Sequence, residues 1–578
     1  MSEQRNMILA IVISMVILLG WQFFLAPEPA PPSEQQQAQQ QAGAPAGQGG
    51  VQVPGTAPGL PTLSLPKDRT AALNESQRIQ IRTKRLTGSI RLQGARIDDL
   101  TLTDYYQTAD KSSPPVELLS PIDAPAPYFA ETGWLAGGGE IKVPGPETEW
   151  QTTDTELSVG SPVTLTWDNG EGLRFTRQIQ LDANYMFTLT HSVENTREDA
   201  VTLYHYGRII RRGTPEISDF FIIHEGPLGV FEEKKELDYS DLREDGVIKE
   251  RSPGGGWLGV SDKYWMAVLI PSQDTSFEGT FAHRFDTGID RYQVDFLTDG
   301  RPLAAGATET QVTRMFAGAK EVHLISAYEE QLNIRLFDKA IDWGWFEFLT
   351  RPFFHAIDFF YSLLGNFGLS IITVTIIVKF IFLPLAWKSY VSMAKMRSLQ
   401  PELVKIRERA GDDRMRMQQD MMALYKKHKV NPVSGCLPIL LQIPVFFALY
   451  KVLFVTIEMR HQPFYGWITD LSAQDPTNLF TLFGLVDWGP PELMHLGIWP
   501  LLMGISMYAQ QKINPQPPDP MQARIMMMLP IVFTFLLARF PAGLVIYWTV
   551  NNVLSIAQQW TIMRITKKRE AAAAGGGA

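Results

Sequence analysis

The stretch Ile371-Ile-Thr-Val-Thr-Ile-Ile-Val-Lys-Phe-Ile-Phe-Leu-Pro384 is apolar apart from two threonines and one charge, Lys379. It belongs to an apolar block over residues 359–385, which as a helix is long enough to cross the ~30 Å hydrocarbon layer. A charge inside such a block costs on the order of 2.5 to 3.5 kcal/mol and usually faces a bundle interior or a wet cavity. The alternative is snorkelling, in which the lysine stem carries the ammonium to the membrane interface.

Five other apolar blocks make six predicted spans, and they cover residues 7–25, 433–455, 494–511, 525–540 and 544–563. The fold class that they predict is an α-helical polytopic membrane protein. The first block predicts an N-terminal transmembrane anchor over residues 1–26. A cleaved signal peptide is the alternative, but the block exceeds the usual ~7 to 15 residues of a signal core. Phe24 also occupies the position where a signal peptidase requires a small residue, so an uncleaved anchor is favoured.

Between the first and second blocks the composition changes twice. Residues 27–66 are rich in Pro, Gln, Ala and Gly, which predicts a disordered linker. Residues 67–338 show short runs in which apolar and polar residues alternate, such as Ile79-Gln-Ile-Arg and Val163-Thr-Leu-Thr-Trp. Alternation with period two predicts a large antiparallel β-sandwich with one buried and one wet face per sheet. Residues 339–358 predict an amphipathic helix, either at the membrane interface or docked on the β domain.

The orientation follows from the basic residues. Residues 387–429 contain eleven Lys and Arg, and an excess of that kind marks the cytoplasmic side. Alternating the spans from there places the β domain outside the cytoplasm, and both termini inside. A basic and then flexible cytoplasmic tail is expected over residues 567–578.

Composition excludes several classes of function. A single cysteine, Cys436, rules out a disulfide framework or a thiolate metal cluster. The chain has a net charge of -9 and no nucleic-acid surface is predicted. No phosphate-binding glycine loop, zinc helix or nucleophile elbow occurs, so no cofactor, metal or catalytic residue is expected. The scattered histidines of the β domain, His205, His224 and His283, are interpreted as hydrogen-bonded structural residues.

Polar residues recur at helical spacing in the predicted spans. Thr375 lies one turn before Lys379, and other stripes carry Tyr547, Asn551 and Ser555, or Ser506 and Gln510. Any one of them is well explained as interhelical hydrogen bonding worth ~0.6 kcal/mol. With Lys379 and Gln442 they predict a hydrophilic groove. No acidic residue lies at comparable depth, so the cation is suited to a transient anionic guest.

The basic segment over residues 388–429 predicts a cytoplasmic helical hairpin broken at Gly411. Its methionine-rich side suits an adaptable binding surface, and its basic side suits lipid headgroups or ribosomal RNA. Self-packing of the hairpin over solvated charges is the alternative reading.

Several motifs in order resemble the YidC/Oxa/Alb family of membrane protein insertases, in its Gram-negative form. They include Ser392-Met-Ala-Lys-Met-Arg-Ser-Leu-Gln-Pro, Gly435-Cys-Leu-Pro, Gln442-Ile-Pro-Val-Phe-Phe-Ala-Leu-Tyr and Phe540-Pro-Ala-Gly-Leu-Val-Ile-Tyr-Trp. The resemblance covers essentially the whole chain. It implies a periplasmic antiparallel β-supersandwich domain and a five-helix insertase core over residues 359–566 in the bacterial inner membrane.

The resemblance also implies function and partners. The family inserts and folds inner-membrane proteins, alone or with the Sec translocon, through a hydrophilic groove with a central positive residue that aligns with Lys379. Most relatives carry Arg there, and a lysine keeps the charge but loses the guanidinium fork. Gln442, Ile443, Pro444 and Phe446 would lie on a substrate-guiding span, with Tyr547 and Trp548 near the groove. The implied partners are nascent membrane proteins, the ribosome, SecYEG with its accessory subunits, and membrane lipids.

The sequence therefore predicts an insertase and chaperone that is not an enzyme. Polar or acidic substrate segments would enter the groove and be held briefly by Lys379, without ATP. An anion-handling solute transporter or channel is the alternative, although no inverted repeats favour it. A third alternative is a sugar-binding receptor or an envelope scaffold, and only the β domain supports this interpretation. The resemblance gives no role to residues 480–496.

Overall fold

The computed structural model describes residues 67–575, apart from 139–140, 218–222, 287, 412, 429, 431–436, 487, 490, 492–493 and 515–519. The predicted anchor over residues 1–26 and the linker over residues 27–66 lie outside the described residues. The described chain forms two compact units, one of which comprises Ser392–Val433 and the other the remaining residues.

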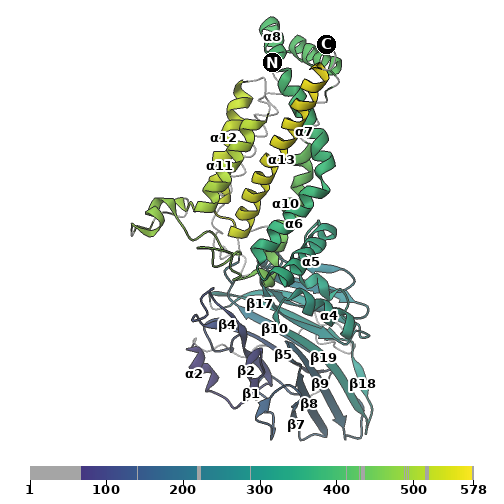
Figure 1. The fold of residues 1–578 in the computed structure, drawn as a ribbon. Coiled ribbons are helices and arrows are strands. Elements are labelled where there is room, and N and C mark those ends of the chain that lie inside the picture. The colour runs from purple at the N-terminus through teal and green to yellow at the C-terminus, as the bar shows by residue number, and fades with distance from the viewer. Residues whose placement is uncertain are drawn as a thin grey trace. The chain divides into compact units, whose positions relative to one another are not determined.

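Two β-sheets form the N-terminal part of the larger unit (Figure 1). The first has 11 strands: β1 (Arg78–Arg82), β2 (Leu86–Arg91), β3 (Arg96–Tyr106), β4 (Pro115–Leu119), β5 (Tyr128–Ala136), β6 (Glu156–Leu157), β10 (Val201–Arg212), β13 (Val247–Ser252), β16 (Phe277–Asp286), β17 (Ile289–Thr298) and β18 (Arg301–Leu303). The second has 8: β7 (Val163–Asp168), β8 (Leu173–Leu181), β9 (Met186–Asn195), β11 (Gly226–Val230), β12 (Lys234–Glu236), β14 (Trp257–Ser261), β15 (Trp265–Pro271) and β19 (Thr308–Ala319). Neighbouring strands are antiparallel, except that β6 pairs with β1 in parallel.

Alternating burial along the strands shows why the sequence pattern predicts these sheets. In β8 the side chains of Leu173, Phe175 and Ile179 are fully buried, whereas Arg174 between them is exposed. The inner faces of the two sheets meet, because Thr132 of β5 hydrogen-bonds His191 of β9 (Oγ1 to Nε2, 3.1 Å). The predicted sandwich is confirmed.

A buried ion cluster joins strands β3, β5 and β10 of the 11-stranded sheet. Glu131 accepts a hydrogen bond from Arg96 (Nε to Oε2, 2.9 Å) and pairs with Arg208, and all three side chains are almost fully buried. His205 hydrogen-bonds Thr313 (Nε2 to Oγ1, 2.8 Å), and burial lowers the pKa of His205 to about 3. The histidine is therefore a neutral structural residue, as predicted.

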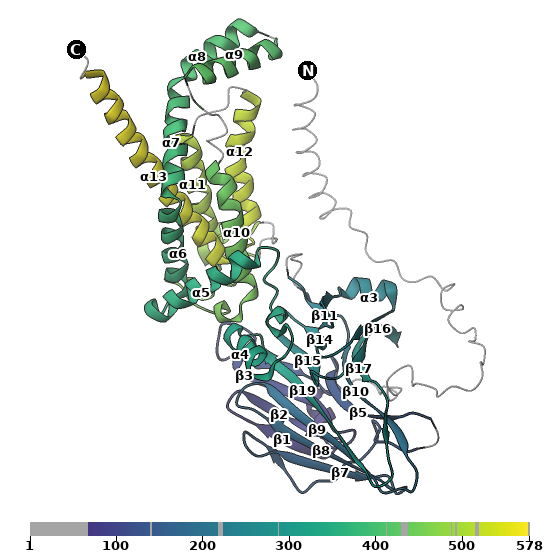
Figure 2. The ribbon, with the colours of Figure 1, turned by 90° about the vertical axis from the view of Figure 1, so that its right-hand side faces the viewer.

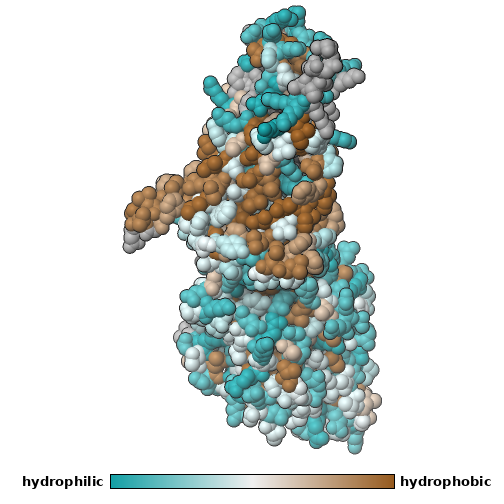
Figure 3. Space-filling view, viewed as in Figure 1, coloured by the Kyte–Doolittle hydropathy of each residue, from teal (hydrophilic) through white to brown (hydrophobic). Residues whose placement is uncertain are grey.

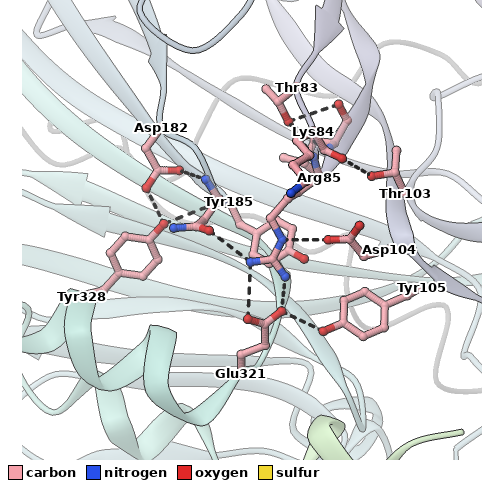
Figure 4. Close-up of polar contacts among 12 residues, drawn as sticks. Thr83, Lys84, Arg85, Thr103, Asp104, Tyr105, Asp182, Tyr185, Glu321 and Tyr328 are labelled. Atoms are coloured by element: carbon pink, nitrogen blue, oxygen red, sulfur yellow. Dashed lines mark hydrogen bonds and ion pairs between the residues drawn. The ribbon is translucent and has the colours of Figure 1, made fainter.

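A polar network holds the helix that leaves the β domain (Figure 4). Arg85 donates to Asp104 (Nε to Oδ2, 3.0 Å) and pairs with Glu321, which also accepts a hydrogen bond from the Tyr105 hydroxyl (2.7 Å). Glu321 directly precedes helix α4 (Val322–Leu332). These contacts fix the start of α4 against the 11-stranded sheet.

The C-terminal helices also contact the start of α4. Glu458, in the short helix η4 (Ile457–Met459), accepts a hydrogen bond from the Val322 backbone N–H (2.7 Å) and so caps α4. Burial raises the pKa of Glu458 to about 7. Arg460 donates to the carbonyl oxygen of Tyr106 (2.7 Å). The β domain is thus joined to the helices by directional polar contacts as well as by the chain.

The remaining helices are α2 (Arg69–Leu73), α3 (Tyr239–Asp245), η2 (Phe337–Ala340), α5 (Glu347–Leu364), α6 (Phe367–Ile381), α7 (Leu383–Ser398), α8 (Gln400–Ala410), α9 (Arg414–Lys427), α10 (Leu437–Val455), η5 (Leu479–Gly484), α11 (Ile498–Ile513), α12 (Pro520–Leu537) and α13 (Ala542–Gly575). Within the described ranges, no single helix combines the length and apolar composition needed to cross a membrane. Helices α6 and α7, bent by 66° at their junction, meet that test as a pair.

Two helix boundaries differ from the sequence prediction. The predicted span over residues 359–385 is divided among α5, α6 and α7, because Gly365 ends α5 in the left-handed conformation and Pro384 lacks the N–H that a continuous helix needs. The predicted amphipathic helix over residues 339–358 begins later, at Glu347. The residues before Glu347 form a turn instead. Gly344 adopts a φ of 71° there, and Asp342 pairs with Lys451 (2.6 Å).

The smaller unit is a helical hairpin (Figure 2). Its helices α8 and α9 pack around Leu399, Leu403, Leu424 and Val430. The hairpin predicted over residues 388–429 is shorter in the structure, because residues up to Ser398 belong to α7 and Pro401 lies in the first turn of α8. Part of the methionine-rich side packs internally, whereas Met415 and Met422 are exposed.

Candidate functional site around Lys379

Lys379 lies near the C-terminal end of α6, just before the bend into α7. Its ammonium donates a hydrogen bond to the hydroxyl of Ser555 on α13 (Nζ to Oγ, 2.7 Å). Ser555 is almost fully buried, and its hydroxyl donates in turn to the carbonyl oxygen of Asn551 (2.7 Å). Among the described residues, no carboxylate lies within ion-pair distance of Lys379. The cation is therefore held by a neutral polar partner.

A small hollow of about 190 Å³ including its open side, with enclosed room for about one water molecule, lies beside Lys379. We call it the Thr375 hollow; its polar wall is formed by Thr375, Lys379, Gln442, Tyr547 and Asn551. The Gln442 amide donates to the Tyr547 hydroxyl, which ties α10 to α13 across this wall. The side-chain oxygen of Asn551 is buried and has no hydrogen-bond partner among the residues that the structure describes. An unused acceptor of this kind marks a place where a donor group could bind.

A second hollow, of about 430 Å³ including its open side, lies on the other side of the cation. We call it the Tyr390 hollow; its polar residues are Lys379, Tyr390, Gln442 and Gln558. Gln558 donates to the backbone carbonyl of Lys379 (3.4 Å), and Tyr390 shares Ser555 with the ammonium through a second hydrogen bond. Because Lys379 and Gln442 line both hollows, the cation stands between them.

The structure brings six of the predicted site residues together. Thr375, Lys379, Gln442, Tyr547, Asn551 and Ser555 surround the two hollows or contact their walls. Thr375 contributes its methyl and backbone more than its hydroxyl, because the hydroxyl donates to the Ile371 carbonyl of its own helix (2.7 Å).

The other predicted residues lie elsewhere. Ser506 of α11 accepts a hydrogen bond from Asn552 of α13 (Nδ2 to Oγ, 3.0 Å), and Gln510 lines neither hollow. Ser506 therefore belongs to the face between α11 and α13. Phe446 packs edge-on against Trp548 (ring centroids 4.6 Å apart), so these two form an apolar seam between α10 and α13.

The remaining two predicted residues are on α10. Ile443 is 44% exposed and lines neither hollow, so its side chain lies on the outer surface of the helix. Pro444 lies inside α10.

Sequence reasoning missed Tyr390 and Phe353 as wall residues. Tyr390 follows Lys379 by 11 residues, about three helical turns, so helical spacing could have placed it on the same face. The excess of basic residues over 387–429 instead predicts that Tyr390 belongs to the cytoplasmic loop. Phe353 comes from α5 and carried no polar signal. The described residues contain no group of three or more His, Cys, Asp or Glu that could hold a metal ion.

Two family models match the chain. One is described as 60Kd inner membrane protein and covers residues 359–570, and the other is described as YidC periplasmic domain and covers residues 78–356. Among curated proteins, the membrane protein insertase YidC of Methylobacterium radiotolerans is 50% identical over 97% of this chain and 95% of its own length. That of Granulibacter bethesdensis is 48% identical over 98% of each. A solved structure of an active YidC insertase aligns with 84% of this chain and 92% of its own at 16% identity, with a TM-score of 0.36.

Proposed function

Since the chain belongs to the family of YidC membrane protein insertases, we propose that Lys379 and its two hollows receive the polar or acidic part of a nascent membrane protein during insertion. The family is one of polytopic inner-membrane insertases with a periplasmic β domain, and it is not a known class of enzyme. The proposal assigns residues 359–566 to the insertase core and residues 67–338 to the periplasmic domain.

The observation that carries the proposal is the environment of the Lys379 ammonium. It is half-buried, its side-chain partner is the neutral Ser555, and it stands between two hollows. A carboxylate entering either hollow would form a charge-assisted hydrogen bond where the local dielectric is low, and such a bond is stronger than one in water. The attraction is temporary, because the substrate must leave again.

The apolar part of the substrate has a separate path. On α6 the side chains of Ile376, Ile377, Phe380 and Ile381 are exposed, which suits contact with lipid tails or with a passing apolar helix. A substrate segment would keep its polar residues near Lys379 while its apolar residues slide along this face into the bilayer. Moving one charge through a potential of 100 mV supplies ~2.3 kcal/mol, so no nucleotide site is required.

The remaining partners follow from the same proposal. Both termini and the hairpin of α8 and α9 would be cytoplasmic, and the hairpin carries exposed basic residues that suit the ribosome and anionic lipids. Exposed Met415 and Met422 would add an adaptable apolar contact to that surface. SecYEG and its accessory subunits would be the translocon partners, as the sequence predicts.

The experiment compares substrates and variants in parallel. Purified protein is reconstituted in vesicles, and insertion is measured for a single-span substrate with an acidic tail and for the same substrate with Asn replacing the tail acids. We expect Lys379→Met to slow insertion of the acidic-tailed substrate by about tenfold or more, equivalent to ~1.4 kcal/mol, and to spare the neutral one. Lys379→Arg should retain most activity, because the charge is kept.

The matched control is Lys567→Met, which removes an exposed lysine of α13. It should insert both substrates at the rate of the parent protein. Equal insertion of the acidic-tailed substrate by Lys379→Met and by the parent protein would overturn the proposal. Anion flux through the reconstituted protein without insertion would favour the transporter alternative.

A further inference from the structure

An exposed apolar segment precedes α11. We call residues Leu479–Val486 and Trp488 the apolar arm. Five of its large side chains are strongly exposed: Leu482 at 54%, Phe483 at 51%, Leu485 at 86%, Val486 at 44% and Trp488 at 49%. In Figure 3 it appears as a brown projection at the side of the helices. Soluble surfaces rarely carry contiguous apolar patches of this kind, so the arm requires a partner.

The base of the arm is held firmly. The Asp475 carboxylate accepts hydrogen bonds from the Trp467 indole (3.1 Å) and from the backbone N–H of Trp499 in the first turn of α11 (2.9 Å). The Leu479 N–H donates to the Leu496 carbonyl (2.8 Å), which fastens the first residue of the arm to the segment just before α11. The arm therefore projects from a fixed root at the start of α11.

The backbone of the arm bonds largely to itself. The N–H of Phe483 donates to the Asn478 carbonyl (2.9 Å), that of Val486 to the Thr481 carbonyl (3.0 Å), and that of Trp488 to the Val486 carbonyl (3.0 Å). Leu482 and Phe483 both adopt positive φ, of 46° and 60°, which is costly for bulky residues and closes this compact turn. Internal bonding of N–H groups is what a segment needs where water is scarce.

The position of the arm identifies which side of the helices it occupies. It follows Glu458 and Arg460, which contact the β domain directly. It lies at the same end of α10 and α11 as that domain. Figures 1 and 3 show it extending sideways from the helices, with its apolar surface continuing the apolar surface of the bundle.

We propose that the apolar arm inserts into the interfacial layer of the membrane leaflet on the side of the β domain and contacts lipid there. The presence of a bilayer follows from the family's membrane location, on which the proposed function also rests. The preference for lipid follows from the residues of the arm. Residues 477–486 contain no charge, and aromatic side chains such as Phe483 and Trp488 favour the level of the lipid headgroups. A protein partner would be expected to meet a polar rim around an apolar centre, and in the sequence of residues 477–488 only Asp487 is charged.

The depth is limited by the backbone. An irregular segment cannot enter the hydrocarbon core, where every unbonded carbonyl is costly. The side chains of Leu485 and Trp488 would therefore reach the boundary between headgroups and acyl chains while the backbone stays among the headgroups. An arm in that position fixes the height and tilt of α11 in the membrane.

The test places an environment-sensitive fluorophore on the arm of the full chain. With Cys436→Ser as the background, the dye is attached to Leu485→Cys, and in the matched control to Val159→Cys, a 52% exposed site of the β domain. Each protein is reconstituted at one copy per lipid nanodisc. We expect blue-shifted emission at residue 485, quenched more by lipids labelled near the headgroup than by lipids labelled mid-chain, and water-like emission quenched by iodide at residue 159.

Water-like emission at residue 485 would overturn the proposal. Blue-shifted emission at residue 485 without quenching by either lipid would also overturn it, because protein would then cover the arm. The same labelling in a Lys379→Met background should give unchanged lipid quenching, so a failure of the proposed insertion mechanism can be told apart from a failure of this one.

Discussion

Replacing Lys379 by methionine should stabilise the protein while it impairs insertion. The half-buried ammonium lies between α6 and α13, and within the described part of the chain its side-chain partner is the Ser555 hydroxyl. A residue that lowers the stability of its own fold is retained where function requires it. A Lys379→Met variant with higher stability and lower insertion activity would therefore identify Lys379 as a functional charge. If the role of Lys379 were purely structural, the substitution would lower both stability and activity.

The magnitude follows from two terms. Removing the buried charge relieves on the order of 2.5 to 3.5 kcal/mol. Losing its hydrogen bond to Ser555 costs about 1.5 to 3 kcal/mol, as for other bonds to a charged group. The Ser555 hydroxyl keeps its bond to the Asn551 carbonyl, so no polar group is left without a partner. The net effect is an increase in unfolding free energy of about 1 kcal/mol.

Ser555→Ala should have the opposite sign. It removes the neutral partner and leaves the ammonium in place, which should lower the unfolding free energy by about 1.5 to 3 kcal/mol. Both variants can be measured by denaturant unfolding in one detergent, with the parent protein alongside. A Lys379→Met protein that unfolds more easily than the parent would refute the reasoning, because its loss of insertion would then be a consequence of instability.

Three further predictions concern other parts of the fold. Gly504→Leu should lower thermal stability in detergent by about 1 to 3 kcal/mol, because a Cβ at Gly504 would lie 2.0 Å from the Thr534 hydroxyl of α12, whereas Ile505→Leu at the neighbouring exposed position should not. Glu458 has its pKa raised from 4.5 to about 7, so its contribution to stability is fully present below about pH 4.5 and is lost as the pH rises through about 7. The loss amounts to about 3 kcal/mol, and Glu458→Gln should flatten the dependence of the thermal midpoint on pH across this window; an unchanged slope would contradict the assignment. Glu131→Gln should cost about 3 to 5 kcal/mol in denaturant unfolding because it leaves Arg96 and Arg208 buried without their carboxylate, whereas exposed Glu244→Gln should change stability by less than about 0.5 kcal/mol.

The β domain was readily predicted because its signal is local. In β8 every second residue is buried, and that alternation is visible in the sequence itself. The pairing of the strands was not predicted, since β10 finds its neighbours β5 and β17 at separations of many residues. Pairing between strands that are far apart in the sequence depends on the whole sheet, so the residue pattern of one short segment does not predict it.

Helix ends were harder to predict than helix positions. Hydropathy averaged along the chain continues through Gly365 and Pro384, so residues 359–385 read as one span. The structure ends one helix at Gly365, which adopts the left-handed conformation, and the next at Phe382, two residues before Pro384, which lacks an N–H and lies in the first turn of α7. The backbone properties of Gly365 and Pro384 therefore determined the helix ends, although the mean hydropathy of the more than twenty residues around them predicted one span.

The site was predicted where polar residues share one helix face, and missed where the faces of two helices had to be matched. Asn551 and Asn552 are adjacent in sequence and point about 100° apart around α13. Asn551 lines the Thr375 hollow, and Asn552 bonds Ser506 on α11. The sequence shows that both are polar, but it does not show which neighbouring helix each one faces. For that reason Ser506 and Gln510 were grouped with Lys379.

The bend between α6 and α7 accounts for the most informative contact that was missed. Lys379 and Tyr390 would lie about 16 Å apart along a straight helix, at 1.5 Å for each of 11 residues. Both nevertheless reach Ser555, one through its ammonium and the other through its hydroxyl. The 66° bend between α6 and α7 shortens the distance between them relative to a straight helix. Lys379 of α6 and Tyr390 of α7 therefore line the same hollow from the two sides of the bend.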